Sequence, residues 1–146
     1  MTEGVAVISG ISGGIGRAIG ERLLYEGYTV VGVGRRHIPP EETAASCMMY
    51  VWCDVRNSKE VSLLSQTAIL CYGRCDLLVI AHGHAPVTTS TIDLDAQTVA
   101  DVLLTDVHGA FLLAQAFGRI MLNQHAGDII FISSLHARQT YPARAP

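Results

Sequence analysis

Charged residues are scarce in this sequence, and lysine is almost absent. Asp, Glu, Lys and Arg make up 16% of the 146 residues, whereas roughly 25% is usual in soluble domains. Ten residues are basic, and Lys59 is the one lysine among them. The net charge of −3 argues against a protein that binds nucleic acid without regard to sequence, because such proteins need a basic surface. Hydrophobic residues make up 49% of the chain, which excludes a disordered chain.

Long apolar runs and paired cysteine motifs are also missing. No uninterrupted apolar run approaches the roughly 18 residues of a membrane span, so we expect no membrane association and a buried apolar surplus. Glu3 stands where a signal peptide has basic residues, and Gly10 interrupts the apolar stretch that follows, so a cytoplasmic protein is expected. The four cysteines include no C-x-x-C pair, which favours reduced thiols over a zinc site or a disulfide framework.

Short apolar runs alternate with longer amphipathic ones along the chain. The predicted strands cover residues 5–9, 28–33, 48–53, 77–81 and 128–133. The predicted helices cover residues 15–26, 60–72 and 95–124. Ser58 is expected to cap the second helix. This alternation predicts an α/β fold, a Rossmann-type doubly wound parallel sheet with the strand order 3-2-1-4-5. The length suits one domain over residues 1–146.

A glycine-rich turn joins the first predicted strand to the first predicted helix. Four glycines lie within the seven residues from Gly10 to Gly16. Gly10 permits a tight turn, Gly14 lets a pyrophosphate approach the backbone, and Gly16 lets helix and strand pack closely. The N–H groups at the start of the helix would then face phosphate oxygens. We therefore predict that Gly10, Ser12, Gly14, Ile15 and Gly16 bind a dinucleotide; a purely structural turn is the alternative.

The end of the second predicted strand indicates which dinucleotide is bound. An acidic side chain at this place would bond the ribose 2′-hydroxyl of NAD, but the sequence has Gly34 there, followed by Arg35 and Arg36. Guanidinium groups can bind a 2′-phosphate through paired hydrogen bonds. The sequence therefore favours NADP(H) over NAD(H). In the alternative interpretation the two arginines only face solvent.

The G-x-x-x-G-x-G spacing of the turn resembles that of the short-chain dehydrogenase/reductase family, and three later segments extend the resemblance. These are Asp54-Val55 after the third strand, Asp76–Val79 leading into the fourth, and Ile129–Ser134 at the fifth. The resemblance implies that Asp54 and Val55 lie against the adenine and that Ser134 orients the substrate. It also implies an oxidoreductase that moves hydride between a nicotinamide and an alcohol or carbonyl substrate.

Two segments depart from the family pattern. Ala81 replaces an asparagine that ties neighbouring strands together in the family, while Gly83 is retained and would let the backbone pass close to the nicotinamide ribose. Asp106 takes the place of an active-site asparagine whose main chain helps to hold a water in a proton relay. By resemblance, Ala81 and Gly83 are candidate cofactor-binding residues, and Asp106 joins Ser134 as a candidate catalytic residue.

Two histidines follow the fourth predicted strand. His82 and His84 are alternate residues, so their side chains could point the same way and ligate a metal ion. No carboxylate or third histidine is obviously paired with them. We therefore expect histidines at the rim of a pocket and no metal site.

The family's reaction depends on a Tyr-x-x-x-Lys pair, in which the lysine lowers the pKa of the tyrosine. No tyrosine in the sequence has a lysine four positions later, and Lys59 lies far upstream. The resemblance thus implies that the domain is incomplete at its C-terminus, holds the cofactor-binding half of the fold and is inactive alone. We expect an open apolar edge at residues 128–133 and an exposed face on the helix at 95–124. A complete chain is expected to form homo-oligomers.

Three functions follow from these observations. The favoured one is the cofactor-binding half of an NADP(H)-dependent short-chain oxidoreductase. The alternative is a non-catalytic module that binds NADP(H) or another chain. A degenerate remnant without a ligand is the weakest, because the special glycines are intact.

Overall fold

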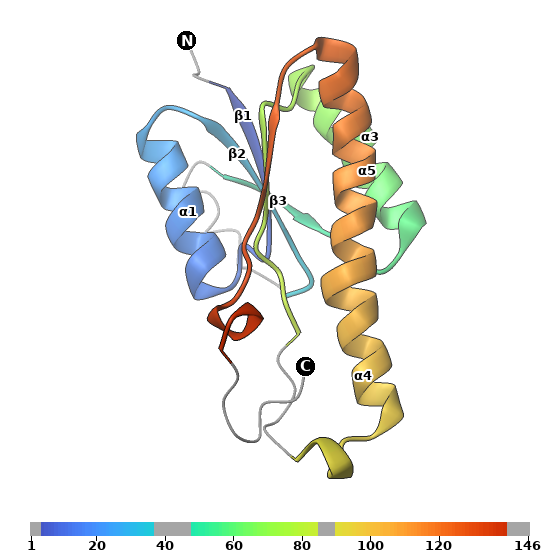
Figure 1. Cartoon of the computed structure of the whole chain (residues 1–146). Coiled ribbons are helices and arrows are strands. Elements are labelled where there is room, and N and C mark those ends of the chain that lie inside the picture. Colours follow the sequence, from blue (N-terminus) through green and yellow to red (C-terminus); the bar gives the residue numbers. More distant parts are fainter. Residues whose placement is uncertain (1–3, 37–47, 85–89, 140–146) are drawn as a thin grey trace.

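The parallel sheet is the framework of the chain, which is represented by a computed structural model that describes residues 4–36, 48–84 and 90–139. Its strands are β1 (Val5–Ser9), β2 (Thr29–Gly34), β3 (Met49–Trp52), β4 (Leu77–Ile80) and β5 (Asp128–Phe131). All neighbouring strands are parallel, and their order is β3-β2-β1-β4-β5 (Figure 1). The predicted Rossmann-type fold and strand order are therefore confirmed.

Helices cover both faces of this sheet. They are α1 (Gly14–Tyr25), α3 (Ser58–Tyr72), α4 (Ala96–Val102) and α5 (Ala110–Gln124). Figure 1 shows α1 on one side of the sheet and α3 with α5 on the other. A π-helical segment, Leu103–Gly109, joins α4 to α5 in one continuous helical stretch. Short 3₁₀ turns lie at Thr91–Asp93 and Leu135–Ala137.

Strand β1 lies in the middle of the sheet, and all five of its residues are buried. Val5 and Val7 pack in the core beneath α3 and α5, whereas Ile8 packs in a second core beneath α1. Side chains alternate between the two faces of a strand. A strand covered on both faces therefore needs the unbroken apolar run seen in the sequence.

The start of α3 corrects one prediction. Ser58 is the first residue of the helix, and Asn57 is the cap, because its side chain accepts the backbone N–H of Lys59 at 3.0 Å. Asn57 also donates to the Glu60 carboxylate at 2.8 Å, so the cap and the first turn bind each other reciprocally. Asn and Ser are equally good caps, which is why the sequence alone favoured the wrong neighbour.

The cysteines of the described region are free thiols. Cys53 and Cys75 are buried, and burial raises the pKa of each thiol to about 12. Cys71 is exposed, and Cys47 lies outside the described residues. The buried pair are packing residues, as the sequence indicates.

Apolar side chains are exposed at β5 and along the helix beside it. Among the described strands β5 pairs only with β4, and Ile130 and Phe131 keep 45% and 56% of their surface exposed. Leu104, Val107 and Phe111 are exposed on the helical stretch. The predicted apolar edge and exposed helix face are therefore present in the described part of the chain.

The stretch Ala96–Gln124 is long and apolar enough, by length and composition alone, to cross a membrane. Helices in the cores of soluble proteins have the same composition. Here Leu113 and Phe117 are fully buried in the core beneath the sheet, so packing accounts for part of its apolar character.

Candidate functional site

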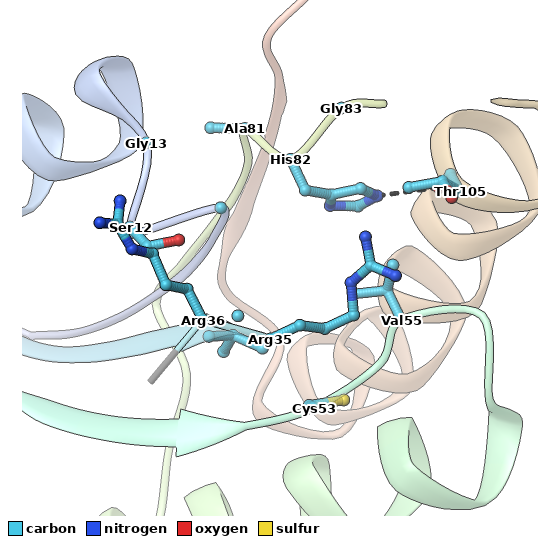
Figure 2. Close-up of a pocket in the computed structure, with 13 residues that line it drawn as sticks. Ser12, Gly13, Arg35, Arg36, Cys53, Val55, Ala81, His82, Gly83 and Thr105 are labelled. Atoms are coloured by element: carbon cyan, nitrogen blue, oxygen red, sulfur yellow. Dashed lines mark hydrogen bonds between the residues drawn. The ribbon is translucent and has the colours of Figure 1, made fainter. Parts of the chain in front are cut away.

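A cavity of about 510 Å³ lies at the carboxyl ends of the strands. Its walls are the turn after β1, the ends of β2, β3 and β4, and Thr105 of the π-helical segment (Figure 2). Strands β2 and β4 lie on opposite sides of β1, so the chain passes from one half of the sheet to the other at this point. Open α/β sheets bind their ligands at such a switch point.

The turn after β1 has the conformation that only glycine adopts easily. Gly10 has a φ of +74°, and a Cβ on it would lie 2.6 Å from the carbonyl oxygen of Ala81. The Gly10 N–H donates to the Val33 carbonyl oxygen at 2.9 Å, and the Gly13 N–H donates to the Gly10 carbonyl oxygen at 2.9 Å. Gly10 therefore allows the ends of β1, β2 and β4 to meet at the cavity.

Gly14 and Gly16 lie in the first turn of α1, where Gly16 is crowded and Gly14 is open. A Cβ on Gly16 would collide with the Gly10 carbonyl group, so this glycine lets α1 approach the turn itself. A Cβ on Gly14 would meet no described atom within 4 Å. No described side chain caps the N-terminus of α1, where Gly13 is the cap residue. Open space beside free helical N–H groups suits a phosphate.

Gly34 and the two arginines after β2 line the cavity together. Figure 2 shows the side chains running in different directions, Arg36 toward Ser12 and Arg35 toward Val55 and His82. A Cβ on Gly34 would lie 3.2 Å from the Tyr50 hydroxyl and 3.6 Å from Ser12 Oγ. A side chain at this position would therefore enter the space beside Ser12 and Tyr50.

Asp54 and Val55 follow β3 but differ in their positions. Val55 is buried and lines the cavity, whereas Asp54 is not among its lining residues. The hydrogen bond from the Arg56 guanidinium, at 2.6 Å, lowers the pKa of the Asp54 carboxyl. Arg35 adds a weaker ion pair at 3.8 Å. Asp54 thus links Arg56 to Arg35. The sequence did not predict this role.

His82 bridges three elements at the back of the cavity. Its Nδ1 lies 2.7 Å from Oγ of Ser9, the last residue of β1, and its Nε2 lies 3.0 Å from the Thr105 carbonyl oxygen. A carbonyl oxygen only accepts, so Nε2 carries the proton, and in the neutral ring Nδ1 accepts the Ser9 hydroxyl. The His82 side chain therefore ties β1, the end of β4 and the helical stretch together.

The surroundings of His82 favour the neutral form of its ring. Burial lowers its pKa from the ordinary value of 6.5, and the positive charge of Arg35 acts in the same direction. Its hydrogen bond to Thr105 and the negative charge of Asp106 oppose this effect. Within the described ranges, no three side chains of His, Cys, Asp or Glu are grouped so as to hold a metal ion.

Replacement of His82 by leucine is expected to lower the free energy of unfolding near pH 7.5 by about 2 kcal/mol, because the hydrogen bonds of the ring to Ser9 Oγ and to the Thr105 carbonyl oxygen are both lost. Because the pKa of His82 is lowered in the folded chain, its ring binds a proton more readily in the unfolded chain. The contribution of His82 to stability is therefore complete above pH 6.5 and decreases as the pH falls below that value. His82→Leu should flatten this fall. Urea unfolding at a series of pH values tests both effects, with His108→Gln as the control. An unchanged pH slope in His82→Leu would show that another group titrates.

Asp106 lies where the loop after β4 meets the π-helical segment. Its Oδ1 accepts the backbone N–H of His84 at 2.8 Å, and a Cβ on Gly83 would lie 3.9 Å from its Oδ2. Asp106 therefore holds the loop that carries Gly83. π-helical segments occur often at functional sites.

The structure brings together only part of the predicted set. Gly10, Ser12, Arg35, Arg36, Val55, Ala81 and Gly83 line the cavity, and Gly14, Ile15, Gly16, Asp54, Asp106 and Ser134 do not. Ser134 is exposed beyond β5, and its carbonyl oxygen accepts the Ala137 N–H at 3.0 Å. Ser9 and Thr105 were missed, because nothing in the sequence relates either residue to His82.

A parallel sheet with a glycine-rich first turn and a cavity at its switch point defines a Rossmann-type α/β domain. The family model of the short chain dehydrogenases matches residues 4–146. The chain belongs to the short-chain dehydrogenase/reductase family, as its motifs indicate.

Individual relatives agree with this assignment. The short-chain reductase protein NovJ of Streptomyces niveus is 33% identical over 144 residues, which cover 93% of this chain and 54% of NovJ. The structure of NAD⁺-bound xylitol dehydrogenase matches with a TM-score of 0.90 and 25% identity over 98% of this chain and 57% of that one. A metagenomic short-chain oxidoreductase in complex with NADP matches with a TM-score of 0.87 and 26% identity, over 99% and 68%. The chain thus spans about half the length of these curated relatives.

Proposed function

We propose that this chain is the cofactor-binding half of an NADP(H)-dependent oxidoreductase that acts on an alcohol or carbonyl substrate. The observation that carries the proposal is the pair Arg35 and Arg36 on the cavity wall, directly after Gly34. Gly34 leaves no carboxylate to bond a ribose 2′-hydroxyl, and two guanidinium groups favour a 2′-phosphate. One relative holds NADP and another NAD⁺, so the preference rests on the residues of this chain.

The residues around the cavity fit a dinucleotide. The pyrophosphate would lie beside Gly14 and the uncapped N-terminus of α1, where no Cβ intrudes. The adenosine end would lie between Arg35, Arg36 and Val55, and the nicotinamide end beside Ala81 and Gly83. The bound nicotinamide supplies or accepts the hydride.

The candidate catalytic residues have separate tasks in this proposal. Ser134 would orient the substrate oxygen by a hydrogen bond from its hydroxyl. Asp106 would fix the loop at Gly83 through its bond to the His84 N–H, and its main chain would help to hold a water. A non-catalytic module that binds NADP(H) in the same cavity is the second candidate.

Titration of the chain with NADPH and NADH, followed by cofactor fluorescence, tests the proposal. We expect NADPH to bind roughly 10- to 100-fold more tightly, because charge-assisted bonds to a phosphate contribute about 1.5–3 kcal/mol. Adenosine 2′-phosphate should compete with NADPH, and adenosine 5′-phosphate should compete less. Failure to bind either dinucleotide would overturn the proposal. NADPH binding without oxidation of NADPH over a panel of carbonyl compounds would favour the second candidate.

A further inference from the structure

Two aromatic side chains of β3 bond the backbone of the arginine pair. The Tyr50 hydroxyl donates to the carbonyl oxygen of Arg36, and the Trp52 indole N–H donates to the carbonyl oxygen of Arg35 at 3.1 Å. Tyr50 and Trp52 are alternate residues of one strand, so their side chains leave the same face. One strand therefore holds two successive peptide groups beside the cavity.

Burial does not explain the presence of Trp52 on this strand. Among the described strands β3 pairs only with β2, and Trp52 keeps 58% of its surface exposed. Large aromatic side chains contribute to stability mainly through burial of their apolar surface. More than half of the Trp52 surface remains exposed, so its burial contributes little. Its one polar group nevertheless bonds the carbonyl group of Arg35.

Gly34 leaves room for the hydrogen bond from Tyr50 to Arg36. A Cβ at position 34 would lie 3.2 Å from the Tyr50 hydroxyl, closer than side chains ordinarily pack. The acidic residue that would favour NAD would therefore press on the hydroxyl that bonds Arg36. An acidic side chain at position 34 and the hydrogen bond from Tyr50 to Arg36 would therefore compete for the space beside Gly34.

Fixed peptide groups change how the arginines bind. A long, flexible arginine that binds a phosphate loses side-chain freedom, and a mobile backbone beneath it would add to that loss. The hydrogen bonds to the carbonyl oxygens of Arg35 and Arg36 already restrict the backbone in the free protein. Less backbone conformational entropy is therefore lost when the ligand binds. The benefit applies to a ligand that carries the 2′-phosphate, because the arginines have no such partner on NADH.

We propose that Tyr50 and Trp52 are positioning residues that make the site selective for a 2′-phosphorylated dinucleotide by holding the backbone of Arg35 and Arg36. This inference rests on the proposed function and adds to it the residues that set its cofactor selectivity. Tyr50 and Trp52 act through the arginines.

The variants Tyr50→Phe and Trp52→Phe test the proposal, because each removes a hydrogen-bond donor and keeps an aromatic ring. The ratio of the NADH and NADPH dissociation constants should fall roughly 3- to 10-fold in each variant, with NADH binding unchanged. Tyr72→Phe is the matched control, because it removes a hydroxyl that bonds Met49 Sδ on α3's side of the sheet. Its ratio should equal that of the unchanged chain.

A second measurement needs no cofactor. Trypsin cleaves after arginine, so the rate of cleavage after Arg35 and Arg36, followed by mass spectrometry, reports how firmly this backbone is held. Both variants should be cleaved there faster than the unchanged chain and the Tyr72→Phe control.

The outcomes separate the two proposals. If the unchanged chain binds NADPH and NADH equally, the proposed cofactor preference fails, and the cleavage rates still test whether the aromatic pair holds the arginines. If the unchanged chain prefers NADPH while the variants keep its affinity ratio, the positioning role is wrong. An equal loss of affinity for both cofactors would also overturn it, because that result indicates general damage to the cavity.

Discussion

Substitution of Gly16 by alanine is expected to destabilise the fold by about 3 kcal/mol, the upper part of the range for overpacking. The added Cβ would overlap the Gly10 carbonyl group and lie 3.1 Å from the Ile11 Cα. These are backbone atoms of a turn held by hydrogen bonds to Val33, so they cannot rotate away as a side chain would. A midpoint of thermal unfolding lowered by roughly 10 °C would correspond to this loss.

Gly14→Ala is the matched control, since it adds the same methyl group two residues earlier. Its Cβ would meet no described atom within 4 Å, and alanine is the better helix former, so stability should be unchanged or slightly higher. NADPH binding should nevertheless weaken by about tenfold or more, because the methyl group would occupy the space proposed for the pyrophosphate. Equal stability losses in the two variants would contradict this account of the turn.

Substitution of Arg36 by serine is expected to weaken NADPH binding by roughly 10- to 100-fold. Arg36 extends toward Ser12 on the side of the glycine-rich turn (Figure 2), where a 2′-phosphate beside Gly34 would meet it. NADH has no 2′-phosphate, so its affinity should not change. The preference of the unchanged chain for NADPH should also decrease as salt is added, because exposed charges are screened.

Arg22→Ser is the control for this substitution. Arg22 lies in the last turn of α1 and forms an ion pair with Glu26. It carries the same charge as Arg36 and does not line the cavity. If Arg22→Ser weakened NADPH binding as much as Arg36→Ser, net charge rather than a specific contact would explain the preference. Isothermal titration calorimetry measures all of these affinities on one scale.

The arrangement of the elements was predictable because each is encoded by neighbouring residues. The apolar run of residues 5–8 and the glycines from Gly10 to Gly16 specify a buried strand, a tight turn and a helix within a short segment. The alternation of such segments leaves few topologies, because parallel crossovers are right-handed. The predicted boundaries agree with the observed ones at β1 and differ by at most two residues elsewhere, as at β5, which ends at Phe131.

The network around His82 could not be predicted, because its members are distant in the sequence. Ser9 and His82 are 73 positions apart, and Thr105 is another 23 away. Each of the three occurs commonly in loops and strand ends, and only the fold brings them together. The π-helical segment has no such local signature either. Gly109 at its end lets the helix approach Val55, since a Cβ there would lie 2.6 Å from Val55 Cγ2.

The central place of β1 in the sheet has a consequence for synthesis of the chain. Among the described strands β1 is synthesised first, but one of its two neighbours, β4, begins only at Leu77. The bond from the Val5 N–H to Asp76 spans 71 positions, which corresponds to about 4 to 14 seconds of translation at ordinary rates. During that time the apolar residues 5–8 lack one of the two strands that cover their edges. Val5–Ser9 is therefore the stretch of the nascent chain for which we expect chaperones to compete with folding.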